Sequence, residues 1–182
     1  MNRFEKVTYL VYKNSINSDC YDCDIQQEYN DIKLPKRGST GSAGYDFFAP
    51  FSLDLEPNET IVIPTGIRWV CDDSIIEEVI GSGGYQKTII HNAKVLKIYP
   101  RSGLGFKYQL GLANTVGIID MDFCKSDDGG HIKVKLVNNG NIPVHIEKGK
   151  GFVQGIIEQY FITEDDNVSS IRNGGFGSTD RR

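Results

Sequence analysis

The sequence predicts an all-β domain, and within that class it favours a jelly-roll barrel with at most one or two short helices. Residues His131–Val137 alternate apolar and polar side chains with a period of two, which is typical of a strand with one buried face. Turn residues separate several similar runs, and the 182-residue chain holds 20 glycines against 6 prolines. Many short strands joined by close turns indicate a barrel or a sandwich.

The other predicted strands are short runs rich in apolar residues, separated by turn signals such as Pro64-Thr65-Gly66. They cover Val7–Tyr12, Thr60–Ile63, Ile67–Val70, Lys94–Tyr99, Ile142–Ile146 and Phe152–Ile162. Helical patterns are weak. Polar residues 18–32 fit one or two helical turns, and a short helix fits after Arg101-Ser102-Gly103.

The length predicts one domain, which the sequence divides into three parts. An N-terminal strand and its extension cover residues 1–35. A β-barrel follows over residues 36–165, with insertions near 71–92 and 125–130. Residues 166–182 are expected to form a mobile C-terminal lid, because glycines crowd the end of the chain.

Composition excludes several classes of function. The net charge of −4 and the isoelectric point near 5.4 argue against non-specific nucleic-acid binding, which needs a basic face. No apolar run approaches the ~18 residues of a membrane span, and the first residues lack a signal peptide's apolar core. We therefore expect an intracellular protein, either cytoplasmic or, in a eukaryote or virus, nuclear. Its cysteines should be reduced thiols: Cys20, Cys23, Cys71 and Cys124.

A guanidinium, a hydroxyl and a small residue follow the predicted strand Lys94–Tyr99. In Arg101-Ser102-Gly103 these groups suit a phosphate cradle, because the glycine leaves its backbone N–H accessible. The plainer interpretation is a strand-to-helix turn with a capping serine, and the segment alone favours it.

A carboxylate directly follows the apolar run Gly117-Ile118-Ile119. Asp120 suits a general base that activates water. Asp120 and Asp122 would share a face on a continuing strand and could then form a metal pair. A polar turn that closes a hairpin is the simpler alternative.

Three further features carry weaker signals. The terminal segment Arg172–Thr179 places one arginine and one phenylalanine among glycines, which suits a lid that clamps phosphate and stacks on a base, or a disordered end. Asp46 suits a hydrogen-bond network or a turn. Cys20 and Cys23 form half a zinc site or a redox pair, but no second cysteine pair completes it.

Taken together, these segments resemble the five ordered motifs of the trimeric dUTP pyrophosphatases, or dUTPases, from about residue 36 to the end of the chain. Each motif alone is a modest match, whereas five in the right order are highly specific. The matching segments are Ser42-Ala43-Gly44-Tyr45-Asp46, Pro100-Arg101-Ser102-Gly103-Leu104, Ala113–Phe123, Lys148–Gln154, and Arg172 with Gly174–Thr179.

The resemblance implies hydrolysis of dUTP to dUMP and pyrophosphate by water attacking the α-phosphorus, which limits uracil in DNA and supplies dUMP for thymidylate synthesis. Asp120 would deprotonate the water, and Ser102 would stabilise the leaving pyrophosphate. Arg101 and the Gly103 amide would hold the phosphate region, with Asp46 in the supporting network. Mg²⁺ would be the cofactor, held mainly by the triphosphate and without direct protein ligands.

The same resemblance implies how the base would be read. Asn114 and backbone groups near Gly117 would match uracil, and the Phe123 ring would lie against deoxyribose. Gln154 would contact the α-phosphate region. In the family the tail comes from a neighbouring subunit, so a homotrimer with shared sites is expected. The tail residues implied to bind substrate are Arg172, Phe176, Gly177 and Ser178.

The chain departs from the family pattern at several positions. Phe123 stands in place of the usual tyrosine, Gly151 in place of an arginine, and a single residue, Asn173, separates Arg172 from the glycine pair. Two alternatives to a dUTPase remain open. One is a dCTP deaminase, which would need a glutamate near the base. The other is a nucleotide-gated binding module that contacts a partner through residues 14–37, 71–92 and 125–130.

Overall fold

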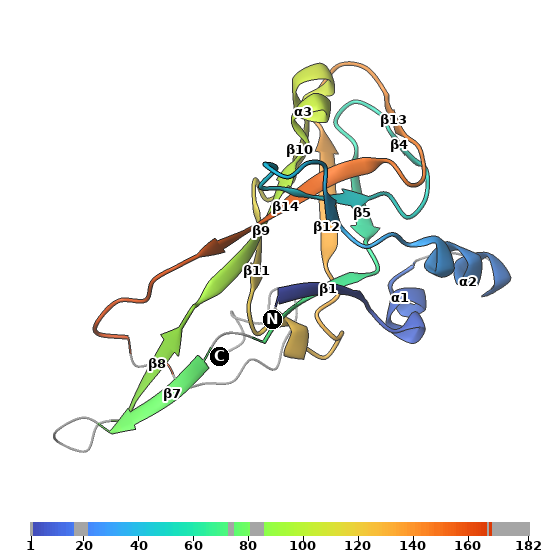
Figure 1. The fold of residues 1–182 in the computed structure, drawn as a ribbon. Coiled ribbons are helices and arrows are strands. Elements are labelled where there is room, and N and C mark those ends of the chain that lie inside the picture. Colours follow the sequence, from blue (N-terminus) through green and yellow to red (C-terminus); the bar gives the residue numbers. More distant parts are fainter. Residues whose placement is uncertain (1, 17–21, 73–74, 81–85, 167, 169–182) are drawn as a thin grey trace.

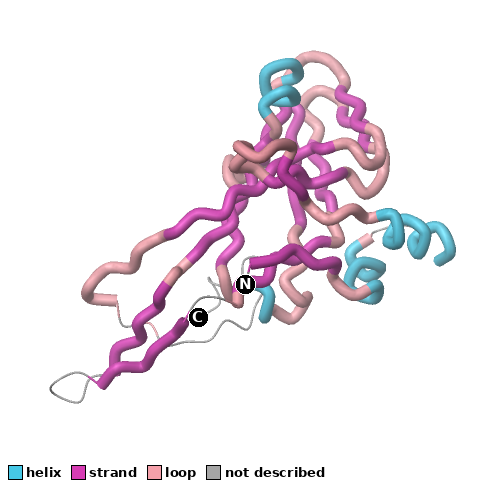
Figure 2. The backbone as a smooth tube through the Cα atoms, viewed as in Figure 1, coloured by secondary structure: helices cyan, strands magenta, loops and turns pink. Residues whose placement is uncertain are grey.

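A computed structural model describes residues 2–16, 22–72, 75–80, 86–166 and 168; for residues 22, 23, 75–80 and 86–91 it describes the backbone alone (Figure 1). Strands make up most of the body, and the helices lie at its periphery (Figure 2). The strands are β1 (Asn2–Lys6), β2 (Lys36–Arg37), β3 (Tyr45–Phe48), β4 (Leu53–Leu55), β5 (Thr60–Pro64), β6 (Ile67–Cys71), β7 (Ile75–Ile80), β8 (Gln86–His91), β9 (Lys94–Pro100), β10 (Leu110–Leu112), β11 (Gly117–Asp120), β12 (Lys133–Asn138), β13 (Val144–Ile146) and β14 (Gly151–Gln159).

A five-stranded antiparallel sheet in the order β11-β9-β14-β3-β2 forms the centre of the fold. A three-stranded sheet, β10-β12-β5, carries the strand predicted at His131–Val137. The pairs β1-β6, β13-β4 and β7-β8 complete the described strands. The architecture is therefore mainly β, as the periodicity of the sequence predicts.

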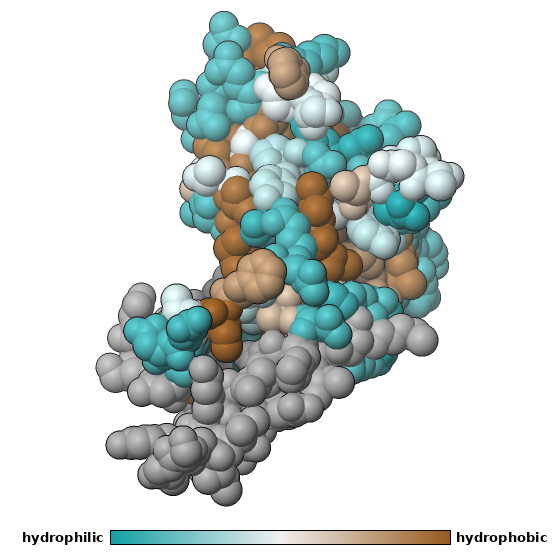
Figure 3. Space-filling view, turned by 60° about the vertical axis from the view of Figure 1, so that its left-hand side comes forward, coloured by the Kyte–Doolittle hydropathy of each residue, from teal (hydrophilic) through white to brown (hydrophobic). Residues whose placement is uncertain are grey.

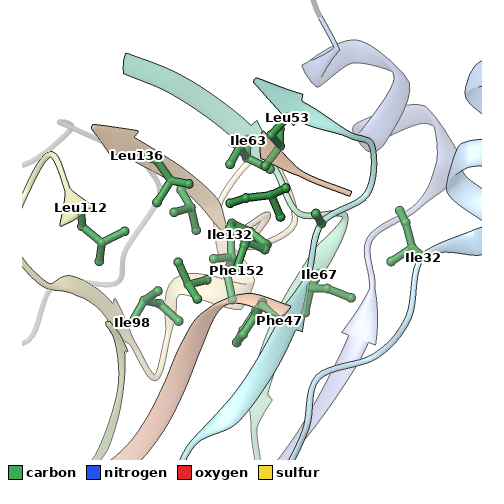
Figure 4. Packing of buried hydrophobic residues seen from close by; sticks show 14 of the residues in the cluster. Ile32, Phe47, Leu53, Ile63, Ile67, Ile98, Leu112, Ile132, Leu136 and Phe152 are labelled. Atoms are coloured by element: carbon green, nitrogen blue, oxygen red, sulfur yellow. The ribbon is translucent and has the colours of Figure 1, made fainter. Parts of the chain in front are cut away.

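The sheets enclose one apolar core, and side chains from distant strands point toward one another in it (Figure 4). Phe47, Phe152 and Leu136 are at most 1% exposed. Trp69, which the sequence also favours as a core residue, is 1% exposed. Burial of each such side chain stabilises the fold by roughly 2–3 kcal/mol.

Successive side chains along the strands of the central sheet point alternately to the core and to the outward face. Phe47 on β3 is directly opposite Val153 on β14, and both are buried in the core. Their neighbours Asp46 and Gln154 are also directly opposite each other and therefore lie on the outward face. This outward face carries most of the polar site residues described below.

The prediction of a strand over Val7–Tyr12 is wrong. The N-terminal strand β1 ends at Lys6, and helix α1 (Tyr9–Ser15) begins after Thr8, whose hydroxyl accepts a hydrogen bond from the Val11 N–H. The apolar residues of this run fit a strand, but the capping threonine starts a helix, and Tyr12 is buried against the core.

The described residues contain three α-helices and one 3₁₀ turn, which exceeds the expected one or two short helices. Helix α2 (Asp22–Asp31) is polar and longer than the one or two turns predicted for residues 18–32. It is anchored by tertiary contacts, since Ile25 is buried and the Glu28 carboxylate accepts a hydrogen bond from Tyr12. Helix α3 (Ser102–Tyr108) lies where a short helix was predicted.

Strands are described in the first predicted insertion, whereas the second consists of turns. The first contains the β7–β8 hairpin, which extends away from the body (Figure 1). The second, residues 125–130, follows the 3₁₀ turn η1 (Phe123–Lys125) and folds on itself, because Ser126 accepts a hydrogen bond from Gly130 and donates one to Asp128. None of the helices among the described residues is long and apolar enough to span a membrane.

Candidate active site

Three of the five motif segments meet on the outward face of the central sheet. Gln154 of β14 lies between Asp46 of β3 and Tyr99 of β9. Its side-chain amide donates a hydrogen bond to the Pro100 carbonyl at 3.2 Å. A Cβ atom at Gly44 would lie 2.5 Å from the Gln154 Oε1 atom, so a glycine is needed for this close approach. The fold thus brings the first, second and fourth segments together.

The Arg101 side chain links these segments through an ion pair and a hydrogen bond. Its Nε atom lies 3.2 Å from a carboxylate oxygen of Asp46, and its Nη1 atom donates to the Gly151 carbonyl at 3.3 Å. The supporting role of Asp46 stays a prediction. The guanidinium remains 43% exposed at the side-chain level, so it can still face a bound anion.

Ser102 and Gly103 begin helix α3, and both are exposed. The capping-serine interpretation is wrong, because Arg101 occupies the N-cap position and makes no side-chain cap bond. Within the described part of the chain, the Ser102 hydroxyl has no hydrogen-bond partner. A Cβ atom built on Gly103 would meet no heavy atom within 4 Å, and Gly103 is exposed. Both groups are therefore accessible to a ligand.

The third motif segment lines a separate cavity of about 640 Å³. Asn114 and Gly117 line it together with Val116 and Ile118, and Lys133–Lys135 of β12 also contribute to the lining. Exposed apolar side chains, among them Val62 and Ile118, contribute to this region. Figure 3 shows how apolar patches interrupt the hydrophilic surface on one face of the molecule. A largely apolar wall with one amide suits a flat heterocycle.

The loop that enters this cavity contains a strained turn. Thr115 has a φ of +65°, a region that β-branched residues rarely adopt. The Val116 N–H donates to the Asn114 carbonyl at 2.7 Å, which closes a γ-turn around Thr115. The sequence gives no sign of this strain, which only the backbone angles reveal. Such strain concentrates at functional sites.

Asp120 ends strand β11 and is exposed. Burial raises the pKa of the nearby Tyr160 hydroxyl, and the charges of Asp120 and Asp122 raise it further. Asp120 and Asp122 would share one face only on a continuing strand, and the alternative is a polar turn. The strand ends at Asp120, and Asp122 adopts helical backbone angles before η1. Among the described residues, no group of three or more acidic, histidine or cysteine side chains could hold a metal ion.

The remaining predicted site residues are Phe123, the tail residues and the cysteine pair. Phe123 is 3% exposed and belongs to the apolar core, so at most an edge of its ring reaches solvent. The predicted lid residues Arg172, Phe176, Gly177 and Ser178 lie outside the described residues, as does Cys20; for Cys23 only the backbone in α2 is described.

The two groups of site residues are far apart within one chain. Asp120 is opposite Val95 of β9, whereas Gln154 is opposite Tyr99. Four residues along β9 span about 13 Å, and two strand spacings add about 10 Å across the sheet. The Cα atoms of Asp120 and Gln154 are therefore roughly 16 Å apart, although both residues lie on the outward face.

Comparison with known proteins decides the family. The family model described as dUTPase matches residues 30–97 and 92–180. This chain belongs to the dUTPase family. The deoxyuridine 5'-triphosphate nucleotidohydrolase of Lactococcus lactis is 34% identical over 151 residues, which are 81% of this chain and 88% of the relative. Its counterpart in Haemophilus influenzae is 32% identical over 160 residues, 84% of this chain and 91% of the relative.

Solved structures confirm the fold class. The dUTPase from Streptococcus mutans matches with a TM-score of 0.59 at 24% identity, over 89% of this chain and 98% of that chain. As a dUTP diphosphatase, the chain hydrolyses dUTP to dUMP and pyrophosphate. The family assignment from five short motifs is confirmed.

Proposed function

We propose that this dUTPase works as a homotrimer whose active sites combine residues of different chains. The observation that supports this most directly is the separation of roughly 16 Å between Asp120 and Gln154. Side chains that far apart do not reach one α-phosphate. If the outward face of one chain adjoins the Asn114–Asp120 segment of a neighbour, both groups can contact the same nucleotide.

In the proposed reaction, the Asp120 carboxylate accepts a proton from a water molecule as the water oxygen attacks the α-phosphorus. A new P–O bond forms, and the bond from the α-phosphorus to the bridging oxygen breaks. The bond's electron pair leaves with pyrophosphate. The Ser102 hydroxyl donates a hydrogen bond to the bridging or β-phosphate oxygen and stabilises this leaving group.

Positioning of the phosphates would fall to the cluster on the outward face. The partly exposed Arg101 guanidinium is oriented by Asp46 and the Gly151 carbonyl. A Cβ atom at Gly103 would meet no heavy atom within 4 Å, and Gln154 lies beside the strand end that leads to Ser102. These groups would bind the α- and β-phosphates before the water attacks.

The cavity lined by Asn114 and Gly117 would take uracil. Asn114 supplies an amide that can pair with the base edge, and a close fit would exclude the methyl group of thymine. We place the edge of Phe123 against deoxyribose. Arg172 would reach the γ-phosphate and Phe176 would stack on the base, with Gly177 and Ser178 beside them.

Dependence on Mg²⁺ is general in this family, and we propose Mg²⁺ as the cofactor of this enzyme. A cation carried by the triphosphate would neutralise phosphate charge and orient the reacting groups. The exposed Asp120 and the phosphate-facing Ser102 and Arg101 fit a cation that the nucleotide brings with it and that contacts protein through water.

One assay tests the proposed specificity. Pyrophosphate release is measured with dUTP, dTTP, dCTP and UTP in the presence of Mg²⁺. Rapid turnover of dUTP alone is expected. Ammonia release from dCTP would instead favour the deaminase alternative.

A second experiment tests the shared site. Ser102→Ala and Asp120→Asn chains, each inactive alone, are unfolded together and refolded as mixed trimers. About a quarter of the sites should then combine an intact Ser102 with an intact Asp120 from a neighbour. Recovered activity supports the shared site, whereas mixed trimers that stay inactive would show that each site lies within one chain.

A further inference from the structure

Lys36 lies in the same row of side chains as two proposed site residues. It is directly opposite Asp46 across the β2–β3 pair, and Asp46 is opposite Gln154 across β3–β14. Directly opposed residues of antiparallel strands point to the same face of a sheet. At about 4.8 Å per strand, the Cα atoms of Lys36 and Gln154 are about 10 Å apart. A lysine that precedes the first motif segment therefore adjoins the proposed phosphate cluster.

The ammonium groups of Lys33 and Lys36 both lie close to one aromatic ring on that face. The Nζ atoms of Lys33 and Lys36 lie 5.8 Å and 5.9 Å from the centroid of the Phe48 ring. Phe48 is two residues beyond Asp46 on β3, so both point outward. Neither ammonium group has a carboxylate partner in the described part of the chain. Two such charges repel each other, and an anion bound between them would remove that repulsion.

A cavity of about 310 Å³ adjoins Lys33 and the Phe48 ring beside which Lys36 also lies. Its lining includes Lys33, Phe48, Lys148 and Gly149. The Lys148 ammonium is paired with Asp31 at 2.8 Å, whereas Lys33 has no carboxylate partner among the described residues. Gly149 has a φ of +78°, and a Cβ atom there would lie 3.1 Å from the Lys33 Nζ atom. The glycine thus gives the lysine room beside the cavity.

We propose that Lys33 and Lys36 bind the distal phosphates of the nucleotide and the pyrophosphate released from it. This inference rests on the proposed function, because it requires the α-phosphate to lie near Ser102 and Gln154. The row Gln154–Asp46–Lys36 then leads away from the reacting phosphorus toward the two lysines beside Phe48. Residues 33–36 are accordingly part of the site, although they precede the first family motif.

The test compares ligands that differ in their number of phosphates. Binding of dUMP and of a non-hydrolysable α,β-imido analogue of dUTP is measured by calorimetry, and pyrophosphate is tested as a product inhibitor. In the Lys33→Gln/Lys36→Gln variant, the imido analogue and pyrophosphate should each bind about tenfold or more weakly, which corresponds to about 1.4 kcal/mol. Binding of dUMP should stay within about twofold, and Lys33→Arg/Lys36→Arg should keep most of the affinity.

Lys97→Gln is the control, because it removes one lysine charge from the same sheet as Lys36, and the Lys97 ammonium is paired with Glu158 at 2.6 Å. It should leave all three affinities unchanged. The inference is overturned if the double glutamine variant binds the imido analogue like the unaltered enzyme, or weakens dUMP equally. Failure of the unaltered enzyme to release pyrophosphate from dUTP would instead refute the proposed function.

Discussion

The guanidinium of Arg101 occupies the space that a side chain at residue 151 would need. A Cβ atom on Gly151 would lie 2.5 Å from the Arg101 Nη1 atom. The same guanidinium contacts Asp46 and the Gly151 carbonyl. The glycine that replaces the family's usual arginine in the fourth motif therefore lets a second-motif arginine rest on strand β14. This relationship leads to the first prediction.

Gly151→Ala should move the Arg101 guanidinium away from Asp46 and reduce activity with little loss of stability. The clash falls on the end of a flexible side chain, so the free energy of unfolding should change by about 0.5 kcal/mol or less. A displaced phosphate ligand should lower kcat/KM for dUTP by about 10- to 100-fold. Gly41→Ala is the control, since a Cβ atom there meets no heavy atom within 4 Å. Normal kinetics in Gly151→Ala would contradict this account.

Thr115→Gly should make the chain more stable and the enzyme slower. Glycine adopts the φ of +65° without steric cost, and relief of strain should outweigh its backbone entropy by up to about 1 kcal/mol. The Asn114–Val116 turn would then be less fixed, which should raise KM for dUTP. Denaturant unfolding and steady-state kinetics measure the two effects. A less stable variant with unchanged KM would argue against stored strain at this turn.

Asp120→Asn should lower kcat by about 10²- to 10⁴-fold, the usual range for loss of a general base. The fold should persist, because Asp120 is exposed at the end of β11. Binding of the non-hydrolysable dUTP analogue should remain close to normal. Single-turnover kinetics and calorimetry separate these effects, and near-normal turnover would remove Asp120 from the role of base.

Stability should fall between pH 6.5 and pH 4 because of His131. Its ring is fully buried, and its Nε2 atom accepts a hydrogen bond from the Gly66 N–H at 2.9 Å. Burial lowers the pKa of His131 to about 4; the nearby Lys133 charge lowers it further and Asp128 partly opposes this. The unfolded chain takes up a proton near pH 6.5, but the folded chain does so only near pH 4. Stability is thus complete above pH 6.5 and declines by up to about 3 kcal/mol toward pH 4.

Denaturant unfolding at pH 7 and pH 5, at one protein concentration, checks the His131 effect. His131→Gln keeps a hydrogen-bond acceptor without a titrating ring, so its stability should depend less steeply on pH. Equal pH slopes for the two proteins would exclude His131 as the source.

Removal of residues 172–182 should reduce kcat/KM strongly, since Arg172 and Phe176 are expected to contact the nucleotide. The oligomeric state and the unfolding temperature should be unchanged, because the described core lies before residue 160. Light scattering, thermal unfolding and dUTP kinetics test this together. Unaltered kinetics in the shortened chain would show that the tail plays no part in catalysis.

Much of this protein follows from the sequence alone. The period-two pattern at His131–Val137, the turn residues between runs and the five short motifs were enough for the β architecture and the dUTPase family. Both predictions depend on local sequence. Alternation of apolar and polar residues indicates a strand with one buried face, and the motif residues are groups that contact phosphate or base. The same local information failed at Val7–Tyr12, where a capping threonine starts a helix in a run that alternates poorly.

Tertiary structure decided the relationships among distant residues. Strand register placed Gln154, Asp46 and Lys36 in one row and separated Asp120 from them by roughly 16 Å. Contacts placed Arg101 over Gly151 and left the Ser102 hydroxyl without a partner among the described residues. Register and packing arise from pairing between segments far apart in the chain, so no local pattern encodes them.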